Sequence, residues 1–318
     1  MNGPAAGLAR YRRRQSFPWT APDWPAGLTR RPPERRLGVD YPTEWARRYP
    51  ARLLRAVLLD NVTRPLSHLV ASPESRGSEV LELVEPPAIF VANHTSHIDT
   101  PLLLSVLPVR WRHQTVVAAA ADHFFDRRWK AHLWALGLGA IPIERHRVNR
   151  RSADIAAELL EAGWNLIIYP EGGRSPDGWF QPFRGGPAYL ARRTRRPVVP
   201  VHVAGTGRIL PKQATRLRRH PTVITFGTPL VPDPDEDARR FGARIEAQLA
   251  TLADEGRSDW WTARRRAASG TTPSPRGPDA APWRRAWALD EDSARHSHDD
   301  DRRWAVARPR GRPRRRVG

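Results

Sequence analysis

The segment that decides the fold runs from Ala88 to Pro101 and has the sequence AIFVANHTSHIDTP. Its first five residues are apolar, which is typical of a short buried strand. The polar loop Asn93–Asp99 follows, and Thr100-Pro101 then has the pattern of a helix N-cap with proline at the first helical position. The segment therefore predicts a strand, a loop at the carboxyl end of that strand, and a helix over 101–107.

The same alternation extends on both sides of this segment, from Pro87 to about Gly256. Short apolar runs predict further strands at 115–121, 140–143, 166–169, 198–203 and 222–226. Helices are expected around 125–138, from a cap at Ser152 to near Gly163, and over 186–194 and 235–254. Strands that alternate with helices predict a single α/β domain, with a largely parallel or mixed sheet flanked by helices.

The composition of the two ends differs from that of the predicted domain, which covers residues 41–256. Residues 1–40 are rich in arginine, proline and glycine and lack apolar periodicity. They predict a disordered Arg/Pro-rich arm. Residues 257–318 return to arginine, proline, aspartate and tryptophan. They predict a disordered Arg/Trp/Pro-rich tail.

An amphipathic helix is predicted near 51–64, at the start of the domain. The apolar side chains along one face of this helix are Leu53, Leu54, Val57, Leu58, Leu59 and Val62. Arginines flank the face at positions 48, 52 and 55. Two interpretations remain open, because such a face can pack on the rest of the domain or lie in a membrane interface.

The composition excludes several classes of site. The 318 residues include no cysteine, which excludes disulfides, thiolate zinc sites and a cysteine nucleophile. No apolar run approaches the roughly 20 residues that span a bilayer. The Arg-rich start also lacks the apolar region of a secretory signal peptide. An integral membrane protein is therefore not expected.

The net charge of +20 lies largely at the ends of the chain. It divides into +5 for residues 1–40, +7 for 41–255 and +8 for 256–318. Of the 53 basic residues only Lys130 and Lys212 are lysines. A basic protein of this kind suits nucleic acid, an anionic membrane surface or phosphorylated small molecules.

Two loops that follow predicted strands carry the polar residues of most interest. In α/β folds, reactive groups gather at the carboxyl ends of strands. The first loop, Asn93–Asp99, offers imidazoles and a carboxylate. The second loop, Tyr169–Gly178, has the sequence YPEGGRSPDG. Its glycines and guanidinium suit a phosphate that is bound by backbone amides and by one bidentate cation.

Four blocks in a fixed order carry a resemblance to a known family. His94 and Asp99 form the first block, with four residues between them. The other three blocks are Ile141–Arg145, Tyr169–Ser175 and Val199–Val201. Together they resemble the glycerophospholipid acyltransferases, the lysophosphatidate acyltransferase family, over roughly residues 50–255. The sequence departs from the family pattern at Gly173, where threonine is usual, and at Tyr169, where phenylalanine is usual.

The resemblance implies an O-acyltransferase of the 1-acylglycerol-3-phosphate type, with that family's α/β fold. Such an enzyme moves a fatty acyl group from acyl-CoA or acyl-carrier protein to the hydroxyl of a lysophospholipid. The simplest acceptor is 1-acyl-glycerol 3-phosphate, which gives phosphatidate. His94 is expected to act as the general base and Asp99 to orient its ring. The residues expected to bind substrate are Asn93, Arg145, Glu171, Gly172, Gly173, Arg174 and Ser175.

No metal and no resident cofactor is expected, since the acyl thioester is a co-substrate. Lipid chemistry without a membrane span predicts a peripheral protein at the cytoplasmic face of the cell membrane, bound to its anionic surface.

Two functions of other classes remain as alternatives. The charge of +20 suits a nucleic-acid-binding protein, but the charge sits at the ends and the middle lacks a recognition-helix signature. Nucleic acid is therefore an unlikely partner. A metal-dependent hydrolase using His94, His97 and Asp99 is the other alternative. Their spacing lacks the close His-x-His pair of familiar dinuclear sites.

Overall fold

The computed structural model describes residues 37–145, 150–212, 214–281 and 284–285. The described residues belong to one compact unit that begins at Leu37. Most of the predicted arm and the part of the predicted tail from residue 286 onward lie outside the described residues.

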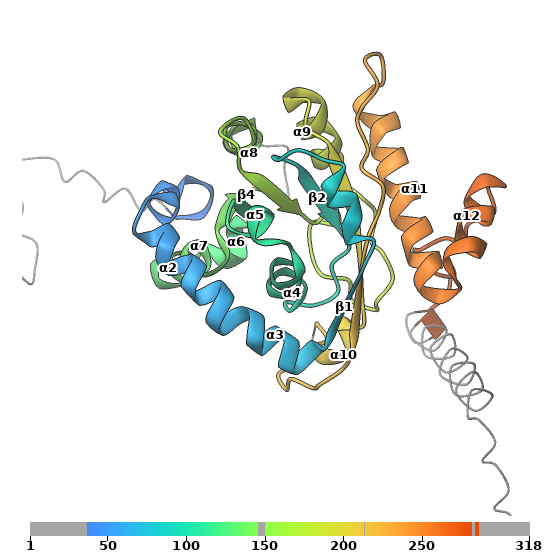
Figure 1. Cartoon of the computed structure of the whole chain (residues 1–318), viewed down its shortest axis with the longest axis horizontal. Helices are drawn as coiled ribbons and strands as arrows, with labels where there is room; N and C mark the ends of the chain where they lie inside the picture. Colours follow the sequence, from blue (N-terminus) through green and yellow to red (C-terminus); the bar gives the residue numbers. More distant parts are fainter. Residues whose placement is uncertain (1–36, 146–149, 213, 282–283, 286–318) are drawn as a thin grey trace, which may run out of the picture. The chain divides into compact units, whose positions relative to one another are not determined.

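The core of the unit is a mixed seven-stranded sheet (Figure 1). Its strands, in spatial order, are β1 (Pro73–Arg76), β7 (Thr222–Phe226), β6 (Val198–Ala204), β2 (Ile89–Ala92), β5 (Asn165–Ile168), β3 (Thr115–Ala120) and β4 (Ala140–Ile143). All neighbours are parallel except β6 and β7, which are antiparallel. The predicted α/β class with a largely parallel or mixed sheet is confirmed. Strand β1 had no counterpart in the sequence prediction, because it is short and polar.

Helices cover both faces of this sheet. The α-helices in the described part of the chain are α2 (Ala51–Leu58), α3 (Arg64–Ala71), α4 (Asp99–Val106), α5 (Val109–Arg112), α6 (Ala121–Phe124), α7 (Arg128–Leu138), α8 (Arg150–Glu161), α9 (Gly186–Thr194), α10 (Thr206–Ile209), α11 (Ala238–Arg257) and α12 (Trp260–Ala268). Three 3-10 turns are η1 (Gly38–Asp40), η2 (Glu44–Arg47) and η4 (Ser78–Glu82). Helices α3 and α4 pack on one face of the sheet, and α8, α9 and α11 pack on the other.

Strand β2 lies at the centre of the sheet, where it positions the first loop. Phe90 pairs in register with Ile167 of β5 and with Val199 of β6. All four β2 residues are buried, as expected for a strand covered on both faces. The loop after β2 therefore leaves the sheet between two neighbouring strands whose carboxyl ends lie at the same edge.

A buried amide at the start of β5 fixes the opposite end of the central strands. The Asn165 side chain accepts a hydrogen bond from the Ala88 amide at 3.0 Å. It donates to the carbonyls of Trp111 and Gln114 at 3.2 and 3.1 Å. Because these backbone groups are buried, the one amide sets the starting level of β2, β5 and the segment that leads into β3.

The predicted helix at 51–64 extends further than expected, through the π turn η3 (Leu59–Thr63) to Ala71. Leu59 points into the core, so it does not widen the exposed apolar face as predicted. Leu53, Leu54, Val57 and Val62 are about half exposed, and so are Leu66 and Leu69 on α3. Within the described ranges, no helix is both long and apolar enough to cross a membrane.

Two predicted helix caps are wrong. Helix α4 begins at Asp99 rather than at Pro101, because the Asp99 carboxylate accepts the amide protons of Thr95 and Ser96. Ser152 lies inside α8, and its hydroxyl accepts the Glu144 amide at 3.0 Å. In both cases the polar side chain satisfies backbone amides of the preceding loop.

The predicted limits of the ordered domain were too narrow at both ends. At the first end, residues 37–40 join the domain, since the Gly38 amide donates to the Phe125 carbonyl at 2.9 Å. At the second end, α12 follows α11. Asp259 caps α12 by accepting the Thr262 amide, and Ala263 is fully buried. The prediction of a disordered tail is therefore wrong for 257–281 and for 284–285.

Asn165 offers a test of how the central strands are aligned. We expect Asn165→Ala to lower the free energy of unfolding by about 3 kcal/mol, because it leaves buried backbone groups without partners. Urea denaturation measures this value. The matched control is Asn61→Ala, which removes one exposed side-chain bond to the Val57 carbonyl and should cost less than about 0.5 kcal/mol. Equal losses for the two variants would contradict the role of Asn165.

Candidate active site

The candidate site lies at the edge of the sheet where five parallel strands end (Figure 1). The loop after β2 carries His94 and Asp99, and the loop after β5 carries Tyr169–Arg174. The segments after β3, β4 and β6 bring Asp122, Arg145 and Thr206 to the same edge. Such an edge is where α/β folds place ligands, and the predicted residues do converge there.

His94 and Asp99 form a hydrogen-bonded pair. The His94 Nδ1 atom lies 2.8 Å from the Asp99 Oδ2 atom. The same Oδ2 atom accepts the amide protons of Thr95 and Ser96 at 2.7 and 2.9 Å. Asp99 is fully buried, whereas the His94 side chain keeps 13% of its surface exposed. The carboxylate therefore holds the ring by one nitrogen and leaves the Nε2 side toward the site.

Tyr169 supports the His94 ring from its face. The two rings stack with centroids 4.1 Å apart and planes 20° apart. The Tyr169 hydroxyl is hydrogen-bonded to Thr100 on α4 at 2.8 Å. Burial, together with the Asp99 charge, raises the pKa of this hydroxyl, so it stays neutral. Tyrosine in place of the usual phenylalanine thus adds a tie between the second loop and the helix that carries Asp99.

Glu171 links the first loop to the segment that follows the second loop. Its Oε1 atom accepts the His94 amide proton at 2.7 Å, and its Oε2 atom accepts the Gln181 amide proton at 2.9 Å. The side chain is buried. Burial raises the pKa of the Glu171 carboxyl to about 7. The Glu171 carboxyl therefore links the two loops, and its expected contact with substrate stays a prediction.

Asn93 and Ser175 are also structural. The buried Asn93 amide donates to the Val203 carbonyl at 2.9 Å and accepts the Val203 amide proton at 2.7 Å. The buried Ser175 hydroxyl donates to the Trp179 carbonyl at 2.7 Å and accepts the Gly178 amide proton at 2.8 Å. Each side chain is thus hydrogen-bonded to backbone groups, and the expected substrate contacts of both residues stay predictions.

The two glycines of the second loop have different reasons to be glycine. Gly172 has φ +70°, and a Cβ there would meet the Arg184 side chain at 2.7 Å. A larger residue is therefore strained at 172. A Cβ at Gly173 would meet the Arg145 Nη1 atom at 3.6 Å, an ordinary contact. The space around residue 173 therefore does not require glycine. The loop has this conformation without the threonine that is usual in the family.

Two arginines reach the same edge. Arg145 forms an ion pair with Asp122 at 2.7 Å, and its Nη1 atom donates to the Gly172 carbonyl at 3.4 Å. The Arg174 Nη1 atom donates to the Lys212 carbonyl at 3.4 Å, and Lys212 donates back to the Arg174 carbonyl. These contacts fix the two guanidiniums beside the second loop, where they are able to take an anionic group.

A second pair of imidazoles stands beside the site. The rings of His97 and His123 are parallel within 2°, with centroids 6.1 Å apart. Burial, helped by the positive charge of Arg174, lowers the pKa of His97 to about 4, so its ring is neutral near pH 7. The sequence prediction missed His123 and Asp122. Their position directly after the strand at 115–121 was the signal that could have found them.

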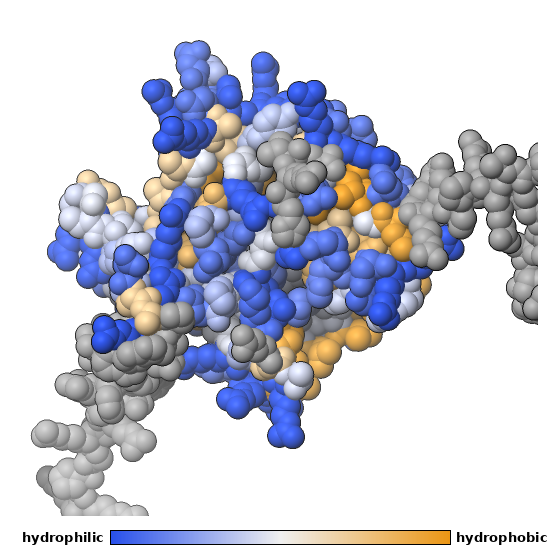
Figure 2. Space-filling model, turned by 180° about the vertical axis from the view of Figure 1, so that it is seen from behind, coloured by the Kyte–Doolittle hydropathy of each residue, from blue (hydrophilic) through white to orange (hydrophobic). Residues whose placement is uncertain are grey.

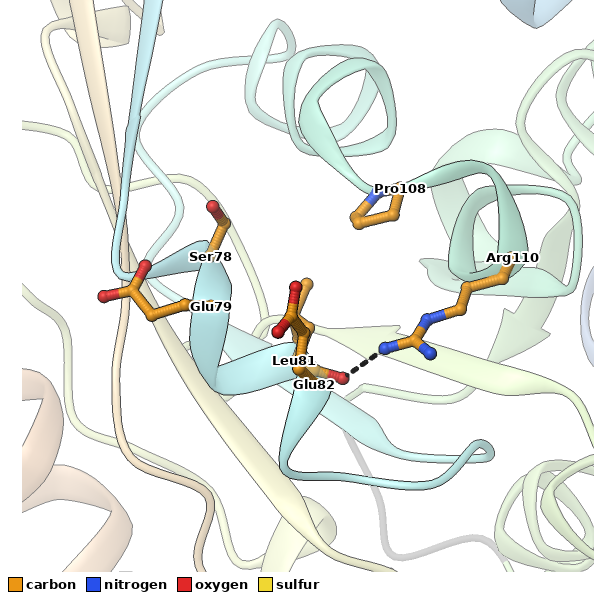
Figure 3. Close-up of a pocket in the computed structure, with 6 residues that line it drawn as sticks. All are labelled: Ser78, Glu79, Leu81, Glu82, Pro108 and Arg110. Atoms are coloured by element: carbon orange, nitrogen blue, oxygen red, sulfur yellow. Dashed lines mark hydrogen bonds between the residues drawn. The ribbon is translucent and has the colours of Figure 1, made fainter.

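No three histidine or acidic side chains in the described part of the chain gather as ligands for a metal ion. A hollow of about 560 Å³ lies elsewhere, between η4 and the turn that leads into α5 (Figure 3). There Arg110 donates to the Leu81 carbonyl at 2.8 Å. Because β1 runs antiparallel to β2, this hollow is at the opposite edge of the sheet from His94.

Known proteins resemble this chain in sequence and in fold. Residues 72–204 match the family described as Acyltransferase. The 1-acyl-sn-glycerol-3-phosphate acyltransferase BAT2, chloroplastic, of Brassica napus is 28% identical over 52% of this chain and 50% of its own length. The 1-acyl-sn-glycerol-3-phosphate acyltransferase of Cocos nucifera is 28% identical over 59% of this chain and 60% of its own length. The chain thus spans about half to three fifths of these relatives.

The fold has a counterpart among solved structures. The 1-acyl-sn-glycerophosphate (LPA) acyltransferase PlsC of Thermotoga maritima superposes with a TM-score of 0.52 at 21% identity. The match covers 79% of this chain and 88% of that chain. This likeness supports the predicted glycerolipid acyltransferase-like fold.

The raised pKa of Glu171 predicts a pH dependence of stability. The carboxyl titrates near 4.5 in the unfolded chain and near 7 in the folded one. Between these values the folded state binds more protons, so stability falls as the pH rises from about 5 to 8. In Glu171→Gln this contribution is absent. We therefore expect the wild-type melting temperature, relative to that of the variant, to decrease over this range in calorimetry. Parallel curves for the two proteins would contradict the assignment.

Proposed function

We propose that the chain, whose residues 72–204 match the Acyltransferase family, acylates 1-acyl-glycerol 3-phosphate to give phosphatidate. The observation that carries the proposal is the His94–Asp99 pair, which lies at the same edge of the sheet as Arg145 and Arg174. A base beside two cations suits an acceptor that has a hydroxyl and a phosphate.

His94 is the base in this proposal. With Nδ1–H donating to Asp99, the Nε2 atom is an acceptor and takes the proton of the substrate hydroxyl. The hydroxyl oxygen attacks the thioester carbonyl carbon and forms the new C–O bond. The tetrahedral intermediate then breaks its C–S bond, and the protonated His94 gives its proton to the departing thiolate. Asp99 stabilises the imidazolium between these steps.

Arg174 and Arg145 hold the phosphate of the acceptor. The Arg174 charge acts on His97 and Asp99, and the amide of the next residue, Ser175, donates to the His94 carbonyl, which supports a role for Arg174 close to the base. Arg145 shares its guanidinium with Asp122 and the Gly172 carbonyl. A dianionic phosphate competes with these partners through charge-assisted, bidentate bonds. Holding the acceptor in this way orients its hydroxyl toward His94.

The acyl donor in this proposal is a thioester, either acyl-CoA or acyl-carrier protein. The steps above transfer protons only among the hydroxyl, His94 and the thiolate. The residues of the site therefore perform them without a resident cofactor.

An exposed apolar face on α2, η3 and α3 supports attachment to a membrane surface. Its members are Leu53, Leu54, Val57, Val62, Leu66 and Leu69. Figure 2 shows apolar patches against a mostly hydrophilic surface. Inserting this face buries apolar area, while arginines beside it meet anionic headgroups. The protein is then peripheral, and we place it at the cytoplasmic face of the cell membrane.

Helix α3, which carries part of this apolar face, also contacts elements of the candidate site. Helix α3 packs against α4, whose first residue is Asp99, and it contacts α10. In α10, Thr206 is hydrogen-bonded to Thr95 at 2.8 Å. Helix α3 is therefore linked through α4 and α10 to the loop that carries His94.

The activity is tested by acyl transfer with product-resolved mass spectrometry. Purified protein receives mixed acyl-CoAs or acyl-carrier protein and a panel of lysolipids in detergent. We expect phosphatidate from the wild type and a rate about 10²–10⁴ lower for His94→Ala and for Asp99→Asn, since each removes general base catalysis. His68→Ala, an exposed histidine on α3, is the control and should keep the wild-type rate. Full activity in folded His94→Ala, judged by circular dichroism, would overturn the mechanism.

Membrane attachment is tested by co-sedimentation with phosphatidylglycerol-containing vesicles. We expect binding that weakens at 0.5 M salt but persists, because apolar burial is not screened. The double variant Leu54→Asp/Leu66→Asp should bind at least about tenfold more weakly, whereas Leu217→Asp, on a loop outside this face, should not. Complete release of the wild type at modest salt would mean that only the charges bind.

A further inference from the structure

We propose that residues 274–281 and 284–285, which lie outside the residues that match the family, form a strap that positions the second loop of the candidate active site, with Arg285 as the positioning residue. The inference rests on the proposed function, because its catalytic readout is acyl transfer. It goes beyond that function by assigning a role to a part of the chain that follows α12 and lies more than a hundred residues from the loop in sequence.

The strap contacts the loop through an ion pair. The Arg285 Nε atom donates to the Asp177 Oδ2 atom at 2.7 Å. The two side chains are 20% and 13% exposed. An exposed ion pair contributes little, but a mostly buried, charge-assisted one holds its partners firmly. Arg285 also donates to the Pro278 carbonyl at 3.0 Å, which closes the strap on itself.

Trp179 is the second point of attachment. Its Nε1 atom donates to the Arg285 carbonyl at 2.8 Å. Gly277 has φ +74° and approaches so closely that a Cβ there would overlap the indole ring. The Arg257 guanidinium forms a cation–π contact with Trp179, 4.4 Å from the centroid of the ring. The neighbouring Phe180 amide donates to the Pro275 carbonyl at 3.0 Å. The strap and the loop therefore share backbone, ring and ionic contacts.

The loop transmits this attachment to His94 in two ways. The other Asp177 oxygen, Oδ1, accepts the Trp179 amide proton at 3.2 Å, and the Ser175 hydroxyl donates to the Trp179 carbonyl. The Ser175 amide in turn donates to the His94 carbonyl at 2.7 Å. Two residues beyond Trp179, the Gln181 amide holds the Glu171 carboxylate, which accepts the His94 amide proton. Both backbone groups of His94 thus depend on the segment that the strap holds.

The experiment compares Arg285→Ala with Arg276→Ala in the full chain. Arg276 lies in the same strap, but its side chain pairs with Glu246 on α11 at 2.6 Å rather than with Asp177. We expect kcat for acyl transfer to fall about tenfold in Arg285→Ala, because small displacements of a base cost rate. The KM for the acyl donor should not change. Arg276→Ala should keep the wild-type kcat even where its melting temperature falls equally. Arg285→Lys should recover most of the loss.

Hydrogen–deuterium exchange gives a readout that does not need activity. Peptides that cover 175–181 should exchange faster in Arg285→Ala and at the wild-type rate in Arg276→Ala. Unchanged exchange in Arg285→Ala would overturn the strap, whatever the activity. Faster exchange with unchanged kcat would overturn the positioning role. If the wild type transfers no acyl group to any acceptor, the proposed function fails, and so does the catalytic role of Arg285, while exchange still reports on the strap.

Discussion

One oxygen atom, Oδ2 of Asp99, fixes the loop Asn93–Asp99, on which the proposed acyl transfer depends. It accepts hydrogen bonds from the His94 ring and from the amides of Thr95 and Ser96, all within 2.9 Å. The carboxylate thereby starts helix α4, folds the loop back on itself and orients the imidazole. Because Asp99 is fully buried, these bonds are not exchanged for water.

A second buried carboxylate completes the arrangement from a distant part of the chain. Glu171 lies 77 residues from His94 in sequence and accepts its backbone amide. The two acids act on different atoms of the same histidine, one on the side chain and the other on the main chain. Burying Glu171 costs free energy in its charged form, which is the origin of its raised pKa. The fixed position of the His94 backbone thus lowers the free energy of unfolding to some extent.

Local sequence patterns were sufficient to predict the alternation of strands and helices, since a run of apolar residues indicates a buried segment. Helix α9 and strand β7 lie where the sequence placed them. Patterns could not show where a polar side chain in a loop points. Asn93, Glu171 and Ser175 have the residue types of a binding loop, yet backbone groups from other segments occupy them. The order of residues 257–281 and 284–285 could not be predicted either, because it depends on long-range partners such as Trp179 rather than on composition.

The distance in sequence between Asp177 and Arg285 has a consequence for synthesis of the protein. The two residues are separated by 108 positions, so the ribosome releases the second loop long before it makes the residue that holds it. The parallel strands that carry His94 are complete at β6, and the antiparallel strand β7 follows. A nascent chain can therefore pair its strands before the second loop gains its contact with Arg285. The attachment of this loop is thus a late step of synthesis, made on a sheet that is already complete.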